Sequence, residues 1–91
     1  MLALVAYDIT EQKRLAKVAK TCEDYGIRVQ YSVFECHLTP SQFEQLWGEL
    51  LALIDSDTDR IVAYRLDEKT FSKTRTAGTM VCHQKAVSYV I

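Results

Sequence analysis

The feature that most constrains the fold is the run from Met1 to Tyr7, which is almost entirely apolar and stops at Asp8. An apolar run of this length that ends at a charge is typical of a strand buried on both faces at the centre of a sheet. Because side chains alternate along a strand, Asp8 shares one face with three apolar residues, Leu2, Leu4 and Ala6. The sequence therefore predicts a central first strand with a carboxylate at its C-terminal end.

Two helices are predicted further along the chain. Residues 11–25 place apolar side chains at helical spacing, with Thr10 as the expected N-cap and Gly26 directly after the helix. The second helix begins at Thr39, where Gln42 completes a capping box and an apolar stripe follows. Both helices therefore have one face suited to packing on a sheet.

The first predicted helix also carries a basic stripe opposite its apolar face. The stripe is made of Lys13, Lys17 and Lys20, with Arg14 alongside. Such a face is often only solvated surface, but doubled across a dimer it would contact nucleic-acid phosphates without reading sequence. An RNA-recognition motif is disfavoured because no Gly-Phe-Gly-Phe pattern is present, although Tyr31 and Phe34 could stack a base.

The remaining segments favour β-structure. Residues 27–38 are rich in β-branched and aromatic side chains, and this pattern alone predicts one long strand, with a hairpin as the alternative. Two further strands are expected at residues 60–66 and 86–91. With the middle segment as a hairpin, the fold class is α+β: a ferredoxin-like βαββαβ sandwich with an additional C-terminal strand.

Size and composition limit the class of protein. Ninety-one residues predict a single domain spanning 1–91, whose small core makes pairing with a second copy favourable. A net charge of −1 means that any nucleic-acid binding must come from local clustering of cations. No apolar run approaches the roughly 20 residues that span a bilayer and no signal segment is visible, so we expect a cytoplasmic protein with no membrane partner. Three cysteines without a CxxC pair fit reduced thiols.

Several motifs for metals or nucleophiles are incomplete. The Asp-rich segment 55–59 matches the start of a calcium loop, but Arg60 replaces the turn glycine and Leu66 stands where the bidentate acid belongs. An Asp-rich turn is therefore the better interpretation. Adjacent strand residues point to opposite faces, so the two Cys-His steps, Cys36-His37 and Cys82-His83, are poor zinc sites. Neither step has the base or oxyanion context of a cysteine nucleophile.

Asp8 allows two interpretations. The ordinary one is a residue that leads into the helix and shares capping with Thr10. The functional one is a metal ligand, since Mg²⁺ is normally held by one or two carboxylates together with water and phosphate oxygens. One carboxylate per chain suffices only if a second copy brings another, so a two-fold axis close to Asp8 would create a shared site open to a phosphodiester. The residues alone leave both interpretations open.

Three segments together resemble CRISPR-associated protein two, a small protein of the CRISPR adaptation module. They are Leu4-Val5-Ala6-Tyr7-Asp8-Ile9 followed by Lys13-Arg14, the block from Tyr25 to Glu35 that contains Arg28-Val29-Gln30-Tyr31-Ser32-Val33-Phe34, and the strand from Arg60 to Leu66. The resemblance covers residues 1–66. It implies a ferredoxin-like fold whose middle segment breaks into two short strands near Tyr31 and Ser32. It also implies a homodimer in which two Asp8 carboxylates face each other and share Mg²⁺ or Mn²⁺.

The same resemblance implies a function. Members of this family are endonucleases assigned metal-dependent cleavage of single-stranded RNA or double-stranded DNA, and they bridge two dimers of the CRISPR integrase, CRISPR-associated protein one, during spacer acquisition. The implied catalytic residue and metal ligand is Asp8, surrounded by Tyr7, Arg14, Arg28, Ser32 and Phe34. A terminal strand containing Val87, Tyr89 and Ile91 is expected to add to the partner's sheet. The alternatives are a non-catalytic DNA-bridging adapter and a free-standing VapD-like toxin ribonuclease.

Overall fold

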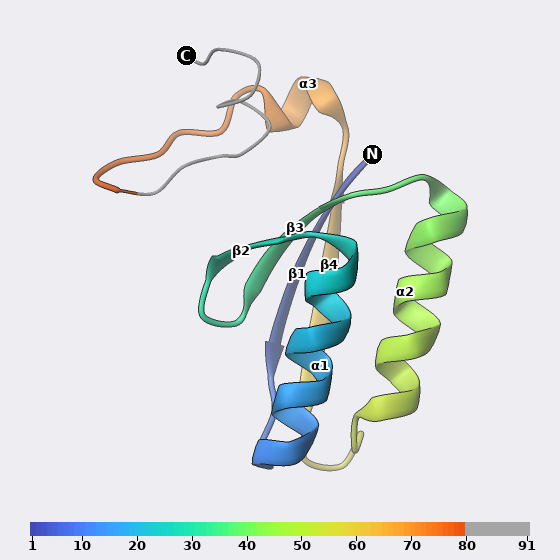
Figure 1. Cartoon of the computed structure of the whole chain (residues 1–91). Coiled ribbons are helices and arrows are strands. Elements are labelled where there is room, and N and C mark those ends of the chain that lie inside the picture. The colour runs from blue at the N-terminus through green and yellow to red at the C-terminus, as the bar shows by residue number, and fades with distance from the viewer. Residues whose placement is uncertain (80–91) are drawn as a thin grey trace.

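The computed structural model describes residues 1–79, which form one sheet covered on one face by two helices (Figure 1). The elements are β1 (Leu2–Asp8), α1 (Gln12–Tyr25), β2 (Ile27–Gln30), β3 (Val33–His37), α2 (Pro40–Leu53), β4 (Arg60–Leu66) and α3 (Glu68–Phe71). The four strands are antiparallel in the order β2-β3-β1-β4. This is the ferredoxin-like βαββαβ sandwich that the sequence predicts. The additional strand expected at 86–91 lies outside the described residues.

β1 is central in the sheet, as predicted, but its two faces are buried unequally. Ala3, Val5 and Tyr7 point towards the helices and are at most 7% exposed. On the other face, Leu4 and Ala6 are only half-buried. The prediction of a strand buried on both faces is therefore wrong for a single chain, because α1 and α2 both pack on the first face (Figure 1). We call the second face of the sheet the open face.

The middle segment is a hairpin and not one continuous strand. β2 and β3 pair in antiparallel fashion, and Tyr31 and Ser32 form the turn between them. The register shifts between Arg28 and Gln30, which marks an irregularity just before this turn. The prediction of a single long strand is therefore wrong, and the break implied by the family resemblance is confirmed.

The first turn of α1 is capped by a residue that the sequence analysis did not select. The carboxylate of Glu11 accepts hydrogen bonds from the backbone N–H of Lys13 at 2.8 Å and of Arg14 at 3.0 Å. The predicted cap, Thr10, instead donates its hydroxyl to Asp59 at 3.0 Å. Thr10 is therefore not the N-cap, because a long-range contact occupies its side chain.

The start of α2 is as predicted and anchors that helix to the core. Thr39 accepts from the Gln42 backbone N–H at 3.1 Å, and the Gln42 side chain accepts from the Thr39 backbone N–H at 2.9 Å. Leu38 and Phe43, which flank this capping box, are both buried in the core. The largest fully buried side chains of the described residues are Phe34, Leu46, Leu50, Val5, Val18, Cys22 and Cys36.

Gly26, between α1 and β2, lies too close to β3 for any side chain. A Cβ there would lie 2.4 Å from the Glu35 carbonyl oxygen and 2.5 Å from Cys36 Sγ. Gly26→Ala is therefore expected to lower the free energy of unfolding by about 1–3 kcal/mol, the usual cost of overpacking. The matched control is Gly48→Ala in α2, where nothing lies within 4 Å of the added Cβ. The control should stabilise by about 1 kcal/mol. Urea unfolding measures both variants, and shifts of the same sign would contradict the argument.

Candidate functional site

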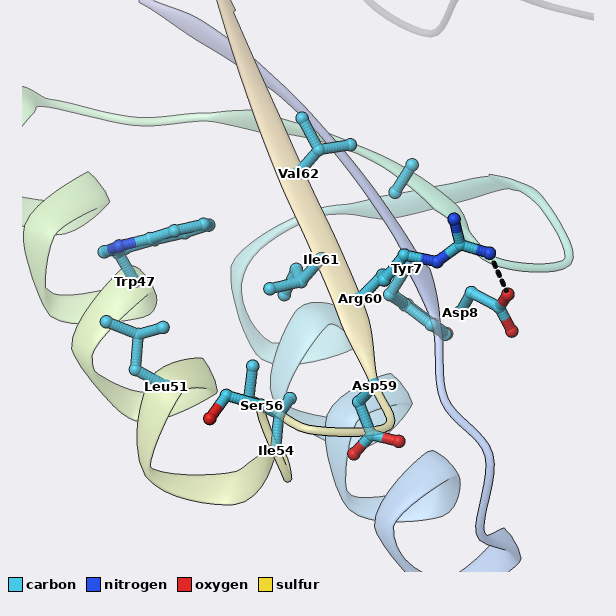
Figure 2. A pocket seen from close by; sticks show the side chains of 11 residues that line it. Tyr7, Asp8, Trp47, Leu51, Ile54, Ser56, Asp59, Arg60, Ile61 and Val62 are labelled. Atoms are coloured by element: carbon cyan, nitrogen blue, oxygen red, sulfur yellow. Dashed lines mark hydrogen bonds and ion pairs between the residues drawn. The ribbon is translucent and has the colours of Figure 1, made fainter.

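Asp8 lies at the C-terminal end of β1, on the open face of the sheet. In the pairing of β1 with β4, Asp8 is directly opposite Arg60, the first residue of β4. The Arg60 guanidinium donates from Nη2 to Asp8 Oδ2 at 3.2 Å, as Figure 2 shows. Both side chains are largely exposed, at 69% for Asp8 and 84% for Arg60. Asp8 therefore presents its carboxylate to solvent with one cation beside it, and the sequence analysis did not identify this cation.

A second carboxylate at this end of the molecule, that of Asp59, is buried and fully engaged. Its Oδ1 accepts from the backbone N–H and the hydroxyl of Thr10, at 2.9 and 3.0 Å. Its Oδ2 accepts from Arg14 Nε at 2.8 Å and from the Asp55 N–H at 2.9 Å. The hydrogen bond from Arg14 is the main cause that holds the pKa of Asp59 well below its ordinary value. Asp59 thus joins the start of α1 to the turn before β4.

The predicted basic stripe divides into two parts in the structure. Lys13 and Lys17 are exposed, and no carboxylate among residues 1–79 forms an ion pair with either. Lys20 pairs with Asp24 at 2.5 Å one turn further along α1. Arg14, which the sequence placed among the phosphate contacts, has its guanidinium bound to Asp59. Lys13 and Lys17 are therefore the cations of this stripe most available to an anionic ligand.

A groove with a volume of about 640 Å³ runs between α1 and the β2–β3 turn. We call it the α1 groove, and its lining residues are Tyr7, Gln12, Lys13, Leu15, Ala16, Ala19, Arg28, Tyr31 and Ser32. Four residues predicted for nucleic-acid binding, Tyr7, Lys13, Arg28 and Ser32, come together here. The groove also includes Tyr31, which the sequence indicated as a residue that could stack a base and which is 95% exposed.

Phe34 does not have the predicted position. It is fully buried, and its ring stacks on that of Tyr7 with the centroids 6.2 Å apart. The expectation that Phe34 contacts a base or sugar is therefore corrected: the ring belongs to the core and supports its neighbours. The Arg28 guanidinium lies over it, 5.2 Å from the ring centroid. Tyr7 is also mostly buried, and this burial raises the pKa of its hydroxyl.

The described cysteines have the character of core residues. Burial raises the pKa of Cys22 to about 12 and that of Cys36 to about 11. His37 is exposed, on the face opposite to buried Cys36, as strand alternation predicts. The second Cys-His step, Cys82-His83, lies outside the described residues. The thiols that the structure describes are therefore poor candidates for a nucleophile.

A single protomer does not supply a complete metal site among residues 1–79. No group of three or more His, Cys, Asp or Glu side chains in this range could hold a metal ion. Asp8 offers a hard oxygen ligand of the kind that Mg²⁺ prefers, but alone it provides one carboxylate. The predicted interface residues Val87, Tyr89 and Ile91 lie outside the described residues. In the part of the chain that is described, no helix has the length and hydropathy needed to cross a bilayer.

Comparison with known proteins tests the family resemblance seen in the sequence. The sequence profile of the family described as CRISPR associated protein Cas2 matches residues 1–74. The chain belongs to the Cas2 family. It is 48% identical over 73 residues to CRISPR-associated endoribonuclease Cas2 1 of Moorella thermoacetica, covering 75% of this chain and 76% of that protein. The resemblance seen in the sequence is therefore confirmed.

Two solved structures share this fold. The crystal structure of Streptococcus pyogenes Cas2 at pH 6.5 has a TM-score of 0.76 and 43% sequence identity, and the match covers 86% of this chain and 100% of that chain. A Cas2-like chain in a structure described as a partial Cas6-RT-Cas1–Cas2 complex has a TM-score of 0.65 and 28% identity, covering 82% and 88% of the two chains. Both comparisons confirm the ferredoxin-like fold.

Replacing Asp59 should change how stability depends on pH. Its folded-state pKa lies below the ordinary value of 3.8, so the unfolded chain binds the proton more tightly. The stability that this carboxylate contributes is therefore complete above about pH 4 and is lost as the pH falls. Asp59→Asn should lower the Tm at neutral pH by about 5 °C or more and flatten the acid limb of the profile.

The control for this variant is Asp57→Asn, which removes an exposed carboxylate of the same turn. Thermal unfolding followed by circular dichroism from about pH 1.5 to pH 7, which includes the range below the unfolded-state pKa, measures both variants. Asp57→Asn should keep the wild-type profile. An acid limb in Asp59→Asn as steep as that of the wild type would contradict the role of the buried carboxylate.

Proposed function

We propose that this Cas2 protein acts in CRISPR adaptation as a homodimeric, metal-dependent endonuclease. The observation that carries the proposal is the position of Asp8, an exposed carboxylate at the end of the central strand, on the face of the sheet that α1 and α2 leave open. The relative named as an endoribonuclease and the structural neighbour from a complex that includes Cas1 support this role. The substrate is a phosphodiester of single-stranded RNA or of double-stranded DNA.

Exposed apolar side chains on the open face, and a buried carboxylate there that is unpaired in the described part of the chain, support the dimer. Ile27, Val62 and Tyr64 point to this face and are 45%, 40% and 59% exposed. Glu35, which lies opposite Leu4 on the same face, is 5% exposed, and its Oε1 has no hydrogen-bond partner within residues 1–79. A buried carboxylate oxygen without a partner is costly. A second copy packed on the open face would cover the apolar side chains and could supply that partner.

The same two-fold packing would complete the catalytic site. With the axis close to the end of β1, two Asp8 carboxylates from two copies form a pair of hard oxygen ligands suited to Mg²⁺ or Mn²⁺. The bound metal would supply an activated water and neutralise charge on the scissile phosphate. In the isolated chain Arg60 donates a hydrogen bond to Asp8. When a metal replaces Arg60 at that carboxylate, the guanidinium would be free to bind a phosphate oxygen and stabilise the added negative charge.

Replacing Asp8 tests the enzymatic proposal. Asp8→Asn keeps the shape of the side chain and removes both negative charges of the shared site, so cleavage of labelled RNA or duplex DNA should fall at least about 100-fold. Binding should persist or tighten because repulsion of phosphate is reduced. The assay compares wild type and variant with Mg²⁺, with Mn²⁺ and with a chelator.

The matched control is Asp57→Asn, which removes an exposed carboxylate of the α2–β4 turn and should cleave like the wild type. Light scattering should give the mass of two 10.4 kDa chains for all three proteins. Equal cleavage by wild type and Asp8→Asn would overturn the enzymatic role. A monomer in solution would overturn the shared site.

A second candidate function is that of a non-catalytic adapter that bridges two dimers of Cas1, the integrase, on duplex DNA. The exposed Lys13 and Lys17 on α1 favour it, because phosphate contacts from a helix face bind DNA without reading sequence. The adapter needs the basic surface but does not need Asp8. A free-standing VapD-like toxin ribonuclease would share Asp8, but the family match over residues 1–74 favours the adaptation role.

Salt dependence tests the basic surface that both functions need. The double variant Lys13→Ala/Lys17→Ala should lower the log-log salt slope of duplex binding by about 0.9 for each phosphate that a lysine no longer neutralises. Arg14→Ala is the comparison: it should lower the Tm but leave the slope almost unchanged, because Asp59 holds that guanidinium. Binding titrations at several salt concentrations measure the slopes. An unchanged slope in the double variant would show that Lys13 and Lys17 are only solvated surface.

A further inference from the structure

The side chain of Tyr31 is not needed for the core of the protein, because it is exposed. It lies in the turn between β2 and β3 and is 95% exposed, whereas Tyr7 is 7% exposed and belongs to the core. A single exposed aromatic residue is common on protein surfaces and has little meaning alone. Here, however, Tyr31 lines the α1 groove, whose other lining residues are suited to binding a nucleotide.

The residues that line the α1 groove are of the types that bind a nucleotide. Two cations line it, Lys13 from α1 and Arg28 from β2, and none of its lining residues is acidic. The lining also includes the small or apolar side chains of Leu15, Ala16 and Ala19. Proteins bind single-stranded nucleic acid with cations that contact the phosphates and with aromatic rings on which the bases stack, and the α1 groove has both beside an apolar surface.

A second groove among residues 1–79 lacks this combination. It has a volume of about 670 Å³ and lies between α2 and the β4 edge (Figure 2). Its lining includes Asp8 and Asp59 together with the apolar side chains of Trp47 and Leu51. Without a bound metal, the exposed carboxylate of Asp8 would repel a phosphate chain there, and Arg60, the only basic lining residue, already pairs with it. A polyanion is therefore expected to bind in the α1 groove.

Arg28 is held in place before any ligand binds. Its guanidinium lies over the buried Phe34 ring at 5.2 Å from the centroid and 4.0 Å from a carboxylate oxygen of Glu23. These contacts limit the conformations that the side chain would lose on binding a phosphate. The groove is thus partly preorganised on the side of β2.

We propose that the α1 groove binds an unpaired nucleobase, which stacks on Tyr31 while Lys13 and Arg28 hold the adjoining phosphates. The proposal rests on the proposed function and selects its substrate class: single-stranded nucleic acid in preference to duplex. In a duplex each base is already stacked and paired, so the Tyr31 ring has no free base face to contact. The phosphates are present in both, so the lysine and arginine contacts do not discriminate.

The groove is connected to the catalytic end of β1. The Tyr7 backbone N–H donates to the Ser32 carbonyl oxygen at 3.1 Å, which joins the turn that carries Tyr31 to the residue before Asp8. Tyr7 lines both grooves, one on each side of the strand end. A flexible strand held at Tyr31 can therefore pass round the end of β1 towards Asp8, whereas a stiff duplex cannot make the same turn.

The experiment measures binding separately from cleavage. Fluorescence anisotropy with a short labelled single-stranded RNA and with a duplex of the same sequence is recorded in the Asp8→Asn background and in chelator. Tyr31→Ala should weaken binding of the single strand by about 5- to 100-fold, the range for loss of one stacked base, and leave duplex binding unchanged. Tyr31→Phe keeps the ring and should restore single-strand binding. Because Tyr31 is exposed, the Tm of both variants should equal that of the background.

Each outcome has a definite meaning. Unchanged single-strand binding in Tyr31→Ala, or an equal loss for single strand and duplex, would overturn the stacking site. Failure of Tyr31→Phe to restore binding would do the same, because the phenyl ring alone should suffice. If Tyr31→Ala loses single-strand binding but Asp8→Asn cleaves like the wild type, the groove stands and the proposed nuclease fails.

Discussion

The geometry of the functional end of this protein depends on one buried carboxylate. Asp59 accepts hydrogen bonds from Thr10, from Arg14 and from the backbone of Asp55, so the start of α1 and the turn before β4 meet at one side chain. Burial of a carboxylate is costly unless hydrogen bonds compensate for the lost water, and at Asp59 both oxygens have such partners. Because Asp59 directly precedes β4, it fixes where that strand begins, and the antiparallel register then places Arg60 beside Asp8.

The unequal faces of β1 explain how one short strand serves both the core and the site. Val5 and Tyr7 pack under the helices and are almost fully buried, whereas Ala6 and Asp8 face the open side. Strand alternation places the last core residue and the exposed carboxylate next to each other in the chain. The candidate site therefore lies directly at the end of the central strand, where Asp8 still pairs with Arg60 of β4 even though its side chain is exposed.

Features that depend on local sequence could be predicted, and features that depend on distant contacts could not. The Thr39 capping box and the central first strand follow from nearest neighbours in the chain. The cap of α1 could not be predicted, because Thr10 bonds to a residue 49 positions away. The turn at Tyr31-Ser32 lacks glycine, proline and asparagine, so the residue pattern favoured one long strand and only the family resemblance placed the break there. The Arg60 partner of Asp8 required the register of β1 and β4.

The two proposals place binding and cleavage on opposite sides of the end of β1, and electrostatics gives the reason. With a net charge of −1, the whole chain does not attract nucleic acid, so the proposed binding of a strand depends on local cations such as those of the α1 groove, whose lining has no carboxylate. The carboxylate needed to bind a metal would repel the same phosphates if it stood in that groove. Placing Asp8 on the other face of the sheet, beside Arg60, separates the two requirements.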